Sequence, residues 1–234
     1  YFGGNKFYGG FGYDTKTNRI YTDLLNTFYS TQAMRLTSSV EEFRPNKETK
    51  ARIDWKATIT FVERLQNARN TGRENAGGFF YNPIDPKAGT TTNASGAVVL
   101  RSYGSITYAG LLAMIFADIS VKDPRVRSTL EWAKWNWTLD ENPGMGQQGL
   151  YFFYYILTRG LVATKKQVIA QPDGTYLNWK EAIARKILSS QKIISDTGQG
   201  YWINENGRFW ENDPVLSTAY CVLALQAIVA SLEI

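Results

Sequence analysis

The amino-acid sequence predicts an all-α domain in which helical hairpins form two concentric layers. Three observations support this fold class. Seven segments have the spacing of apolar residues that is typical of helices, whereas strand-like alternation is scarce. These segments alternate between helices that are apolar on nearly every side and helices with one charged face. Similar loops rich in glycine and aromatic residues recur between them, as in a repeat architecture.

The predicted helices are, in chain order, residues 22–36, 53–70, 102–119, 123–137, 143–161, 177–192 and 215–232. The first begins at Thr22 or Asp23, which are suitable N-cap residues, and Asp54 caps the second. Asp123 followed by proline is a strong start signal for the fourth. Asn178 caps the sixth, with a glutamate three residues on.

The repeat is carried by three cognate loops, GGFGYD at Gly9, GGFFYN at Gly77 and GQGYWI at Gly198. Each loop precedes a predicted buried helix with a threonine near its start, and these threonines are Thr27, Thr107 and Thr218. Gly149 to Tyr151 occupy a similar place in the helix over 143–161. A period of roughly 55–70 residues, one loop plus two helices, predicts a single domain over residues 1–234 with about four repeats.

Composition excludes several classes of function. The net charge is +5 without any run of five like charges, which predicts a solvated surface and no nucleic-acid partner. No segment reaches about 18 uninterrupted apolar residues, so no membrane span is predicted. The chain has no histidine, which excludes Ser-His-Asp and Cys-His nucleophiles and imidazole zinc sites. The single cysteine, Cys221, lies in an apolar run, and no metal site or cofactor is predicted.

The stretch ENPGMGQQGLYFFYY holds the pattern G-x-G-x-x-G on Gly144, Gly146 and Gly149. A dinucleotide-binding loop needs a strand before these glycines and an acidic residue about 20 positions later. Neither is present, because the preceding residues end a helix and no acid occurs between Glu141 and Asp173. We therefore predict that these glycines allow backbones to approach closely at the start of a buried helix.

Three stretches carry a family resemblance: GGFFYNP with SYGSITYAGLLAMIFA, DENPGMGQQGLYFFYY, and GYWINENGRFWENDPVLSTAYCVLAL. They resemble the repeats of the prenyltransferase and squalene-cyclase superfamily over nearly the whole chain. The resemblance implies an α/α toroid with buried inner helices, amphipathic outer helices and an aromatic-lined cavity for an isoprenoid. It also implies either an open ring that a partner domain completes or the C-terminal part of a longer chain, because the family's full ring has more helices.

The chemistry of the family is matched only in part. Asp23-Leu24-Leu25-Asn26-Thr27 is similar to the D-x-D-D-T motif of triterpene cyclases, but Leu25 and Asn26 replace the two adjacent acids. The magnesium motif D-D-x-x-D is absent, and the zinc site of protein prenyltransferases lacks its histidine. The superfamily also includes thioester domains with G-C-G-E-Q, where this chain has Met145 in place of the cysteine. These departures are compatible with a non-catalytic domain.

Two sets of candidate residues follow. The candidate catalytic acids, each with helix capping as the alternative role, are Asp23, Asp140, Glu141 and Asp213. The candidate substrate-binding aromatics, with packing and loop fastening as the alternative, are Tyr103, Tyr108, Tyr151, Tyr154, Tyr155, Trp202 and Trp210.

Three functions remain open at this point. The first is an isoprenoid-handling enzyme or its relative, in the manner of a terpenoid cyclase. The second is a carbohydrate-active lyase or hydrolase, for which Trp202, Trp210 and Tyr201 beside Arg208 would suit sugar stacking. The third is a non-catalytic toroid that binds a partner. A closed apolar cavity would favour the first, an open polar groove with tyrosine and arginine the second, and a filled ring the third.

Overall fold

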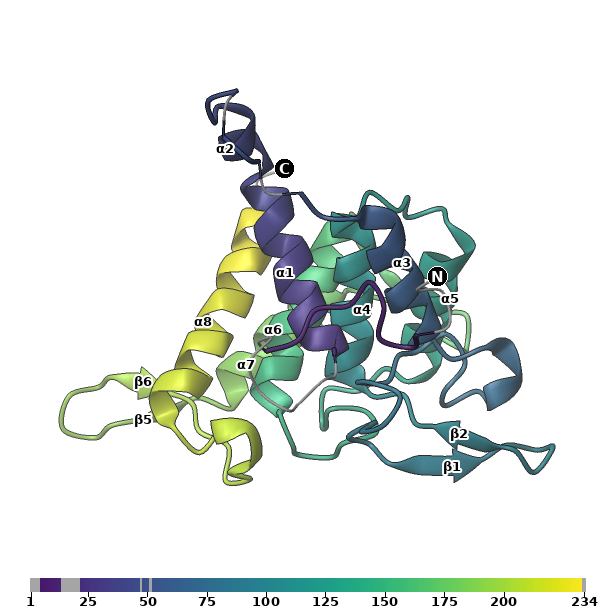
Figure 1. Ribbon diagram of the computed structural model, residues 1–234. Helices are drawn as coiled ribbons and strands as arrows, with labels where there is room; N and C mark the ends of the chain where they lie inside the picture. The colour runs from purple at the N-terminus through teal and green to yellow at the C-terminus, as the bar shows by residue number, and fades with distance from the viewer. Residues whose placement is uncertain (1–4, 14–21, 47, 51, 233–234) are drawn as a thin grey trace.

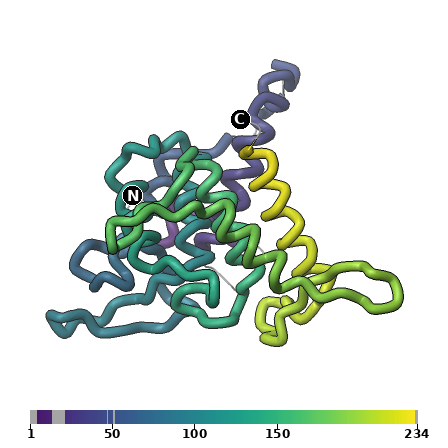
Figure 2. The backbone as a smooth tube through the Cα atoms, turned by 180° about the vertical axis from the view of Figure 1, so that it is seen from behind, coloured from purple at the N-terminus to yellow at the C-terminus, as the bar shows by residue number. Residues whose placement is uncertain are grey.

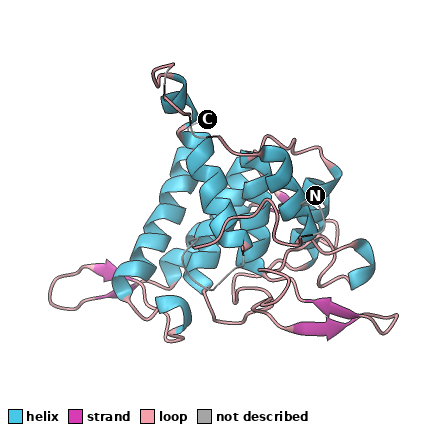
Figure 3. Ribbon diagram, viewed as in Figure 1, coloured by secondary structure: helices cyan, strands magenta, loops and turns pink. Residues whose placement is uncertain are grey.

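The computed structural model describes residues 5–13, 22–46, 48–50 and 52–232, and over these residues the domain is mostly helical (Figures 1 and 3). The described part contains eight α-helices and three small antiparallel hairpins. None of these helices combines the length and apolarity that crossing a membrane requires.

The α-helices are α1 (Leu24–Leu36), α2 (Ser38–Glu42), α3 (Trp55–Arg64), α4 (Gly104–Phe116), α5 (Pro124–Trp135), α6 (Leu150–Ala163), α7 (Trp179–Ser189) and α8 (Pro214–Ala230). Two short 3-10 helices are η1 (Arg69–Thr71) and η2 (Arg208–Trp210). The hairpins pair β1 (Thr90–Thr92) with β2 (Val98–Leu100), β3 (Ile169–Ala170) with β4 (Tyr176–Leu177), and β5 (Lys192–Ile193) with β6 (Gly200–Tyr201). A helix is present in each of the seven predicted segments, although α3 ends at Arg64 and not at residue 70 as predicted, and the short α2 and the hairpins were not predicted.

Four helices form a row through the middle of the domain, which we call the central row. Its most extensive contacts join α1 to α4, α4 to α6 and α6 to α8, while α3 and α5 pack on α4 and α7 packs on α6 and α8. Figures 1 and 2 show α8 at one edge of the row. Because α4 lies between two row neighbours, it buries almost every residue, whereas α8 leaves many of its apolar side chains exposed.

The helices of the central row run in the same direction. Arg35, near the C-terminal end of α1, donates from Nε to the carbonyl of Phe116 at the C-terminal end of α4 over 2.7 Å. Arg159, in the C-terminal half of α6, donates from Nη1 to the side-chain oxygen of Gln32, in the C-terminal half of α1, over 3.3 Å. The flanking helices α3, α5 and α7 lead the chain back from the end of one row helix to the start of the next, as in helical hairpins. The N-terminal turns of the row therefore lie on one side of the domain.

Side-chain caps explain where five of the helices begin. Each cap accepts a hydrogen bond from a backbone N–H in the first turn, which satisfies a donor that has no partner within the helix. These caps are Asp23 of α1, Asp54 of α3, Asp123 of α5, Asn178 of α7 and Asp213 of α8. The capping roles predicted for the first four are thus confirmed.

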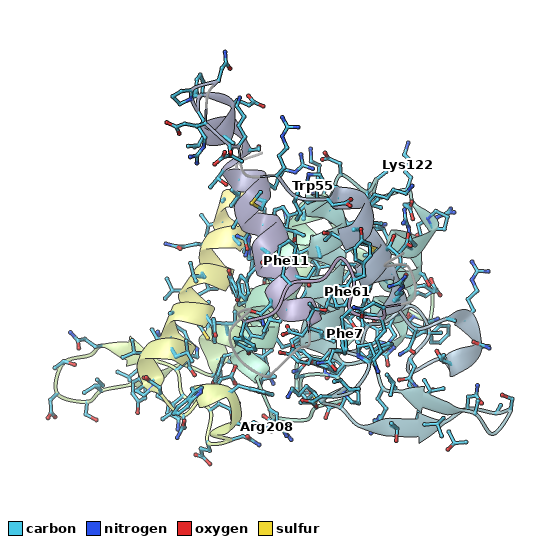
Figure 4. All side chains as sticks on the ribbon, in the orientation of Figure 1. Phe7, Phe11, Trp55, Phe61, Lys122 and Arg208 are labelled. Carbon is cyan, nitrogen blue, oxygen red and sulfur yellow. The ribbon has the colours of Figure 1, made fainter. Side chains whose placement is uncertain are left out.

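The repeat predicted from the loops has a structural counterpart in three equivalent hydrogen bonds. In each, a backbone N–H of the loop donates to the threonine hydroxyl of the row helix that follows. The pairs are Phe11 to Thr27 at 3.0 Å, Phe79 to Thr107 at 3.0 Å, and Trp202 to Thr218 at 3.1 Å. Phe11, which supplies the first of these N–H donors, is labelled in Figure 4. The threonine near each helix start therefore fastens the preceding loop to the helix.

Two of the repeat loops also touch a flanking helix through glycine. Gly9 and Gly77 have φ values of +89° and +85°, in the left-handed region that favours glycine. A Cβ atom added to Gly9 would lie 2.0 Å from the carbonyl oxygen of Ala57 in α3. One added to Gly77 would lie 2.2 Å from the carbonyl oxygen of Ser128 in α5. The loops therefore approach the flanking helices as closely as backbone allows.

The glycine pattern before α6 forms a turn, so the predicted start of this helix at residue 143 was wrong. Gly144, Gly146 and Gly149 all have positive φ, and the helix begins at Leu150. A Cβ on Gly144 would lie 2.7 Å from the carbonyl oxygen of Ser102, so the predicted close approach of backbones is confirmed for Gly144. It was wrong for Gly146, where nothing lies within 4 Å, and for Gly149, which faces side-chain atoms only. Met145 is buried in the core beside them.

We expect Asp123→Ala to lower the free energy of unfolding by about 1 kcal/mol at pH 7. Asp123 caps α5, and its carboxylate receives 2.7 Å bonds from Nε and Nη2 of Arg125, which lower its pKa to about 2. A lowered folded-state pKa stabilises the protein above the unfolded pKa of about 3.9, and this contribution is lost as the pH falls toward about 2. Urea unfolding of the unchanged protein and of Asp123→Ala, at pH 7 and at a pH below about 3.9, measures how much stability Asp123 contributes at each pH. If the two proteins differ in unfolding free energy by the same amount at both pH values, the predicted pH dependence is wrong.

Candidate functional site

The tyrosine pocket, as we name it, is a cavity of about 390 Å³ at the N-terminal side of the central row. Its lining residues are Tyr13, Leu25, Tyr29, Tyr81, Lys87, Tyr103, Ser105, Gly149, Phe152, Phe209 and Tyr220. Five of them are tyrosines, two are phenylalanines and one is a lysine. The pocket is therefore aromatic and carries many hydroxyl groups.

All four row helices contribute to this pocket from their first two turns. Leu25 and Tyr29 come from α1, Ser105 from α4, Phe152 from α6 and Tyr220 from α8. The parallel direction of the row brings these turns together. The loops that precede the row helices supply the remaining walls, including the 3-10 helix η2 at the lower edge of the view, where Figure 4 labels Arg208.

A buried carboxylate lies behind the pocket wall. Asp23 is completely buried, and its carboxylate accepts bonds from the backbone N–H of Asn26 at 2.8 Å and from Asn26 Nδ2 at 2.7 Å. It is also hydrogen-bonded to the hydroxyl of Tyr81. Asp23 therefore fixes Tyr81 and the start of α1 at the same time.

Four of the pocket tyrosines keep their protons at neutral pH. Burial raises the pKa of Tyr29 to about 12 and raises the pKa of Tyr81, Tyr103 and Tyr220 as well. A tyrosine that acts as a general base needs a pKa lowered toward neutral pH. These four side chains are thus suited to stacking and to hydrogen bonding through their hydroxyl groups.

Cationic side chains hold two walls of the pocket in place. Lys87 Nζ lies 5.1 Å from the ring centroid of Tyr81 and forms an ion pair with Asp85. On the opposite side, Tyr220 stacks on Tyr155 with centroids 5.7 Å apart and an interplanar angle of 21°. Arg159 donates to the hydroxyl of Tyr155 over 2.8 Å. The aromatic rings are therefore oriented before any ligand arrives.

The predicted aromatic residues do not gather in this pocket. Tyr103 lines it, and Tyr155 supports it through Tyr220. Tyr108 and Tyr154 lie in the core, where the Tyr154 hydroxyl donates to the carbonyl of Leu139 over 2.5 Å. Tyr151 lines a separate cavity beside Asn204.

The two predicted tryptophans lie outside the pocket as well. Trp202 is buried and donates from Nε1 to the carbonyl of Ile187 over 2.7 Å, which fastens its loop to α7. Trp210 is 79% exposed.

The predicted acids are dispersed as well. Asp23 lies behind the tyrosine pocket, and Asp213 caps α8. Asp140 is exposed and pairs with Lys186 at 2.6 Å. Glu141 lines a different groove, described below. The structure therefore does not bring these four carboxylates into one site.

Sequence reasoning missed most of the pocket residues, although the repeat contained a signal for them. Tyr13 and Tyr81 occupy the same position in the cognate loops GGFGYD and GGFFYN. Tyr29 and Tyr220 each follow the repeat threonine by two residues. Aligning the repeats by these positions would have identified four of the five tyrosines.

Glu211 is a second buried carboxylate, and it fastens the loop before α8 to α6. It is completely buried, and it accepts bonds from the backbone N–H of Phe152 at 2.7 Å and from Asn204 Nδ2 at 2.8 Å. Burial raises its pKa against the opposing effect of these hydrogen bonds. Because Phe152 lines the tyrosine pocket, Glu211 helps to position this wall.

Comparison with known proteins adds no relative to this description. No protein-family model, curated protein or solved structure matches the chain. Within the described ranges, no group of three or more acidic or cysteine side chains is arranged to hold a metal ion.

Proposed function

We propose that the domain binds a saccharide unit in the tyrosine pocket. The observation that carries this proposal is the gathering of five tyrosines and two phenylalanines around one open cavity. A pyranose ring has apolar C–H faces that pack on aromatic rings and hydroxyl groups that exchange hydrogen bonds with tyrosine. The cavity volume of about 390 Å³ lies within the range of small-molecule sites.

The proposal includes the arrangement of the helices as an arc of an α/α toroid. The central row would form the inner layer, and α3, α5 and α7 the outer layer. The parallel row helices, the burial of α4 and α6, and the repeated loop-to-threonine bonds support this assignment. So does the resemblance of the repeat loops to those of the squalene-cyclase and prenyltransferase superfamily.

A second candidate ligand is an isoprenoid, which the apolar side chains of Leu25, Phe152 and Phe209 favour. A prenyl chain would cover the tyrosine hydroxyls without forming hydrogen bonds to them, which costs about 1–3 kcal/mol for each buried group. The acid that would start cyclisation, Asp23, is already bonded to Asn26 and Tyr81. A saccharide can therefore both pack on the aromatic rings and form hydrogen bonds with the tyrosine hydroxyls, whereas an isoprenoid can only pack.

The test uses isothermal titration calorimetry with neutral hexasaccharides of glucose, xylose, mannose and N-acetylglucosamine. We expect one of them to bind, and Tyr220→Ala to weaken its affinity by about tenfold or more, because the stacking face is lost. Tyr220→Phe keeps the ring and should weaken binding less. Tyr176→Ala is the matched control, since Tyr176 is exposed on the β3–β4 hairpin.

Equal affinity of Tyr220→Ala and the unchanged protein would place the saccharide elsewhere and contradict the proposal. A parallel measurement by native mass spectrometry offers farnesol and squalene. Retention of either lipid, together with no heat from any saccharide, would replace the saccharide with the isoprenoid.

A further inference from the structure

A second cavity, which we call the tryptophan groove, lies at the C-terminal end of α5. Its volume is about 240 Å³, and it lies between this helix end and the loops that precede α4 and α6. Its lining residues include Glu74, Arg101, Trp132, Trp135, Trp137 and Glu141. Ser102 lines this groove, and the next residue, Tyr103, lines the tyrosine pocket. The backbone segment before α4 therefore lies between the two cavities.

The indole rings of the groove are fixed by contacts within the protein. Trp135 is 39% exposed, and the guanidinium carbon of Arg73 lies 4.0 Å from its ring centroid. Its Nε1 donates to Glu131 over 2.9 Å. Trp132 is held by a 2.8 Å bond from its Nε1 to the carbonyl of Glu74. A ligand that stacks on Trp135 would therefore meet a preformed ring and would lose little affinity to ordering it, whereas Trp132 is 2% exposed and lies behind the groove surface.

Charged side chains of both signs surround the indole rings, and most of their hydrogen-bonding atoms have no partner in the described part of the chain. The side chains of Arg101 and Glu141 are exposed and form no hydrogen bond or ion pair with the part of the chain that the structure describes. Glu74 is also exposed and accepts only a long bond of 3.3 Å from the side chain of Asn75. A free guanidinium and two carboxylates thus face one small cavity.

This combination selects a neutral polyhydroxylated ligand. A cation would meet Arg101, and an anion would meet Glu74 and Glu141, so either would face a like charge. A sugar can accept hydrogen bonds from the guanidinium, donate to the carboxylates and stack an apolar face on indole. We infer that the tryptophan groove is a carbohydrate-binding subsite, separate from the tyrosine pocket and independent of whether that pocket binds sugar.

The test labels the protein with 5-fluorotryptophan and follows its fluorine NMR signals, assigned by single Trp→Phe variants. The probes are the same four neutral hexasaccharides, each at up to about 10 mM. We expect one of them to shift the signals of Trp135 and Trp137. Trp135→Ala should weaken the affinity measured at Trp137 by about tenfold. Glu141→Gln, which keeps the shape of the side chain, should weaken it by about threefold.

Two variants serve as controls. Trp210→Ala removes an indole that is 79% exposed outside the groove, and Tyr220→Ala alters only the tyrosine pocket. Both should leave the affinity at Trp137 unchanged within about twofold. Unchanged Trp135 and Trp137 signals with all four probes would overturn the inference, as would shifts that Tyr220→Ala abolishes. If the Trp135 and Trp137 signals still shift in Tyr220→Ala and no saccharide binds at the tyrosine pocket, the inference about the tryptophan groove is supported. In that case only the proposed function is refuted.

Discussion

Replacing Gly77 by alanine is expected to lower the free energy of unfolding by about 3 kcal/mol or more. The backbone at Gly77 has a φ of +85°, which an alanine adopts only with strain. The added Cβ would also lie 2.2 Å from the carbonyl oxygen of Ser128. The loop would have to withdraw from α5, and this withdrawal would disturb the bond from Phe79 to Thr107.

Gly174→Ala provides a matched control for this prediction. Gly174 has a φ of +86°, but no atom lies within 4 Å of an added Cβ. This variant therefore pays only the backbone cost of about 1–2 kcal/mol. Urea unfolding monitored by circular dichroism compares the two variants. Equal losses of stability would show that the close approach of the loop to α5 contributes nothing.

We expect Glu211→Ala to lower the free energy of unfolding by about 3 kcal/mol. Removing the completely buried carboxylate leaves the backbone N–H of Phe152 without its side-chain acceptor, and Asn204 Nδ2 keeps only its bond to the carbonyl of Gln147. Glu211→Gln keeps the size and one acceptor oxygen, so its effect should be smaller. Glu205→Gln is the control, because Glu205 belongs to the same loop and its side chain is 93% exposed.

The effect of Glu211→Gln should also depend on pH. Burial raises the folded-state pKa of Glu211, so the folded protein binds this proton more tightly than the unfolded chain does. The stability that this preference contributes is present below the unfolded pKa of about 4.3 and is lost as the pH rises through the folded pKa. The difference in unfolding free energy between the unchanged protein and the variant should therefore be larger at about pH 4 than at about pH 7. A difference that grows with pH would contradict this prediction.

Much of the fold could be predicted from the sequence because its signals are local. The caps Asp54 and Asp123 and the period of the apolar residues define α3 and α5 without reference to the rest of the chain. In contrast, α2 has only five residues, and the strands of each hairpin have two or three. Segments of that length are too short to show a period. Their formation depends instead on contacts with other segments of the same chain, such as the antiparallel pairing of β1 with β2.

The candidate site was harder to predict, because aromatic density is a poor guide to the lining of a cavity. The run of five aromatics at residues 151–155 lies on α6, which packs between α4 and α8, so most of these rings are buried. Only Phe152 from this run lines the tyrosine pocket. The other walls come from loops whose meeting point depends on the arrangement of the whole row.

The parallel direction of the central row has an electrostatic consequence. In an up-and-down bundle the dipoles of neighbouring helices oppose one another, but here they add, each with roughly half a positive charge at its N-terminal end. The carboxylates of Asp23, Glu211 and Asp213 lie at the positive ends of α1, α6 and α8. The start of α4 receives neutral oxygens instead, because the N–H of Gly104 donates to the carbonyl of Pro143 and the N–H of Ser105 donates to the amide oxygen of Asn142. The acidic residues thus balance three of the four dipoles, and the unbalanced one ends at the tyrosine pocket.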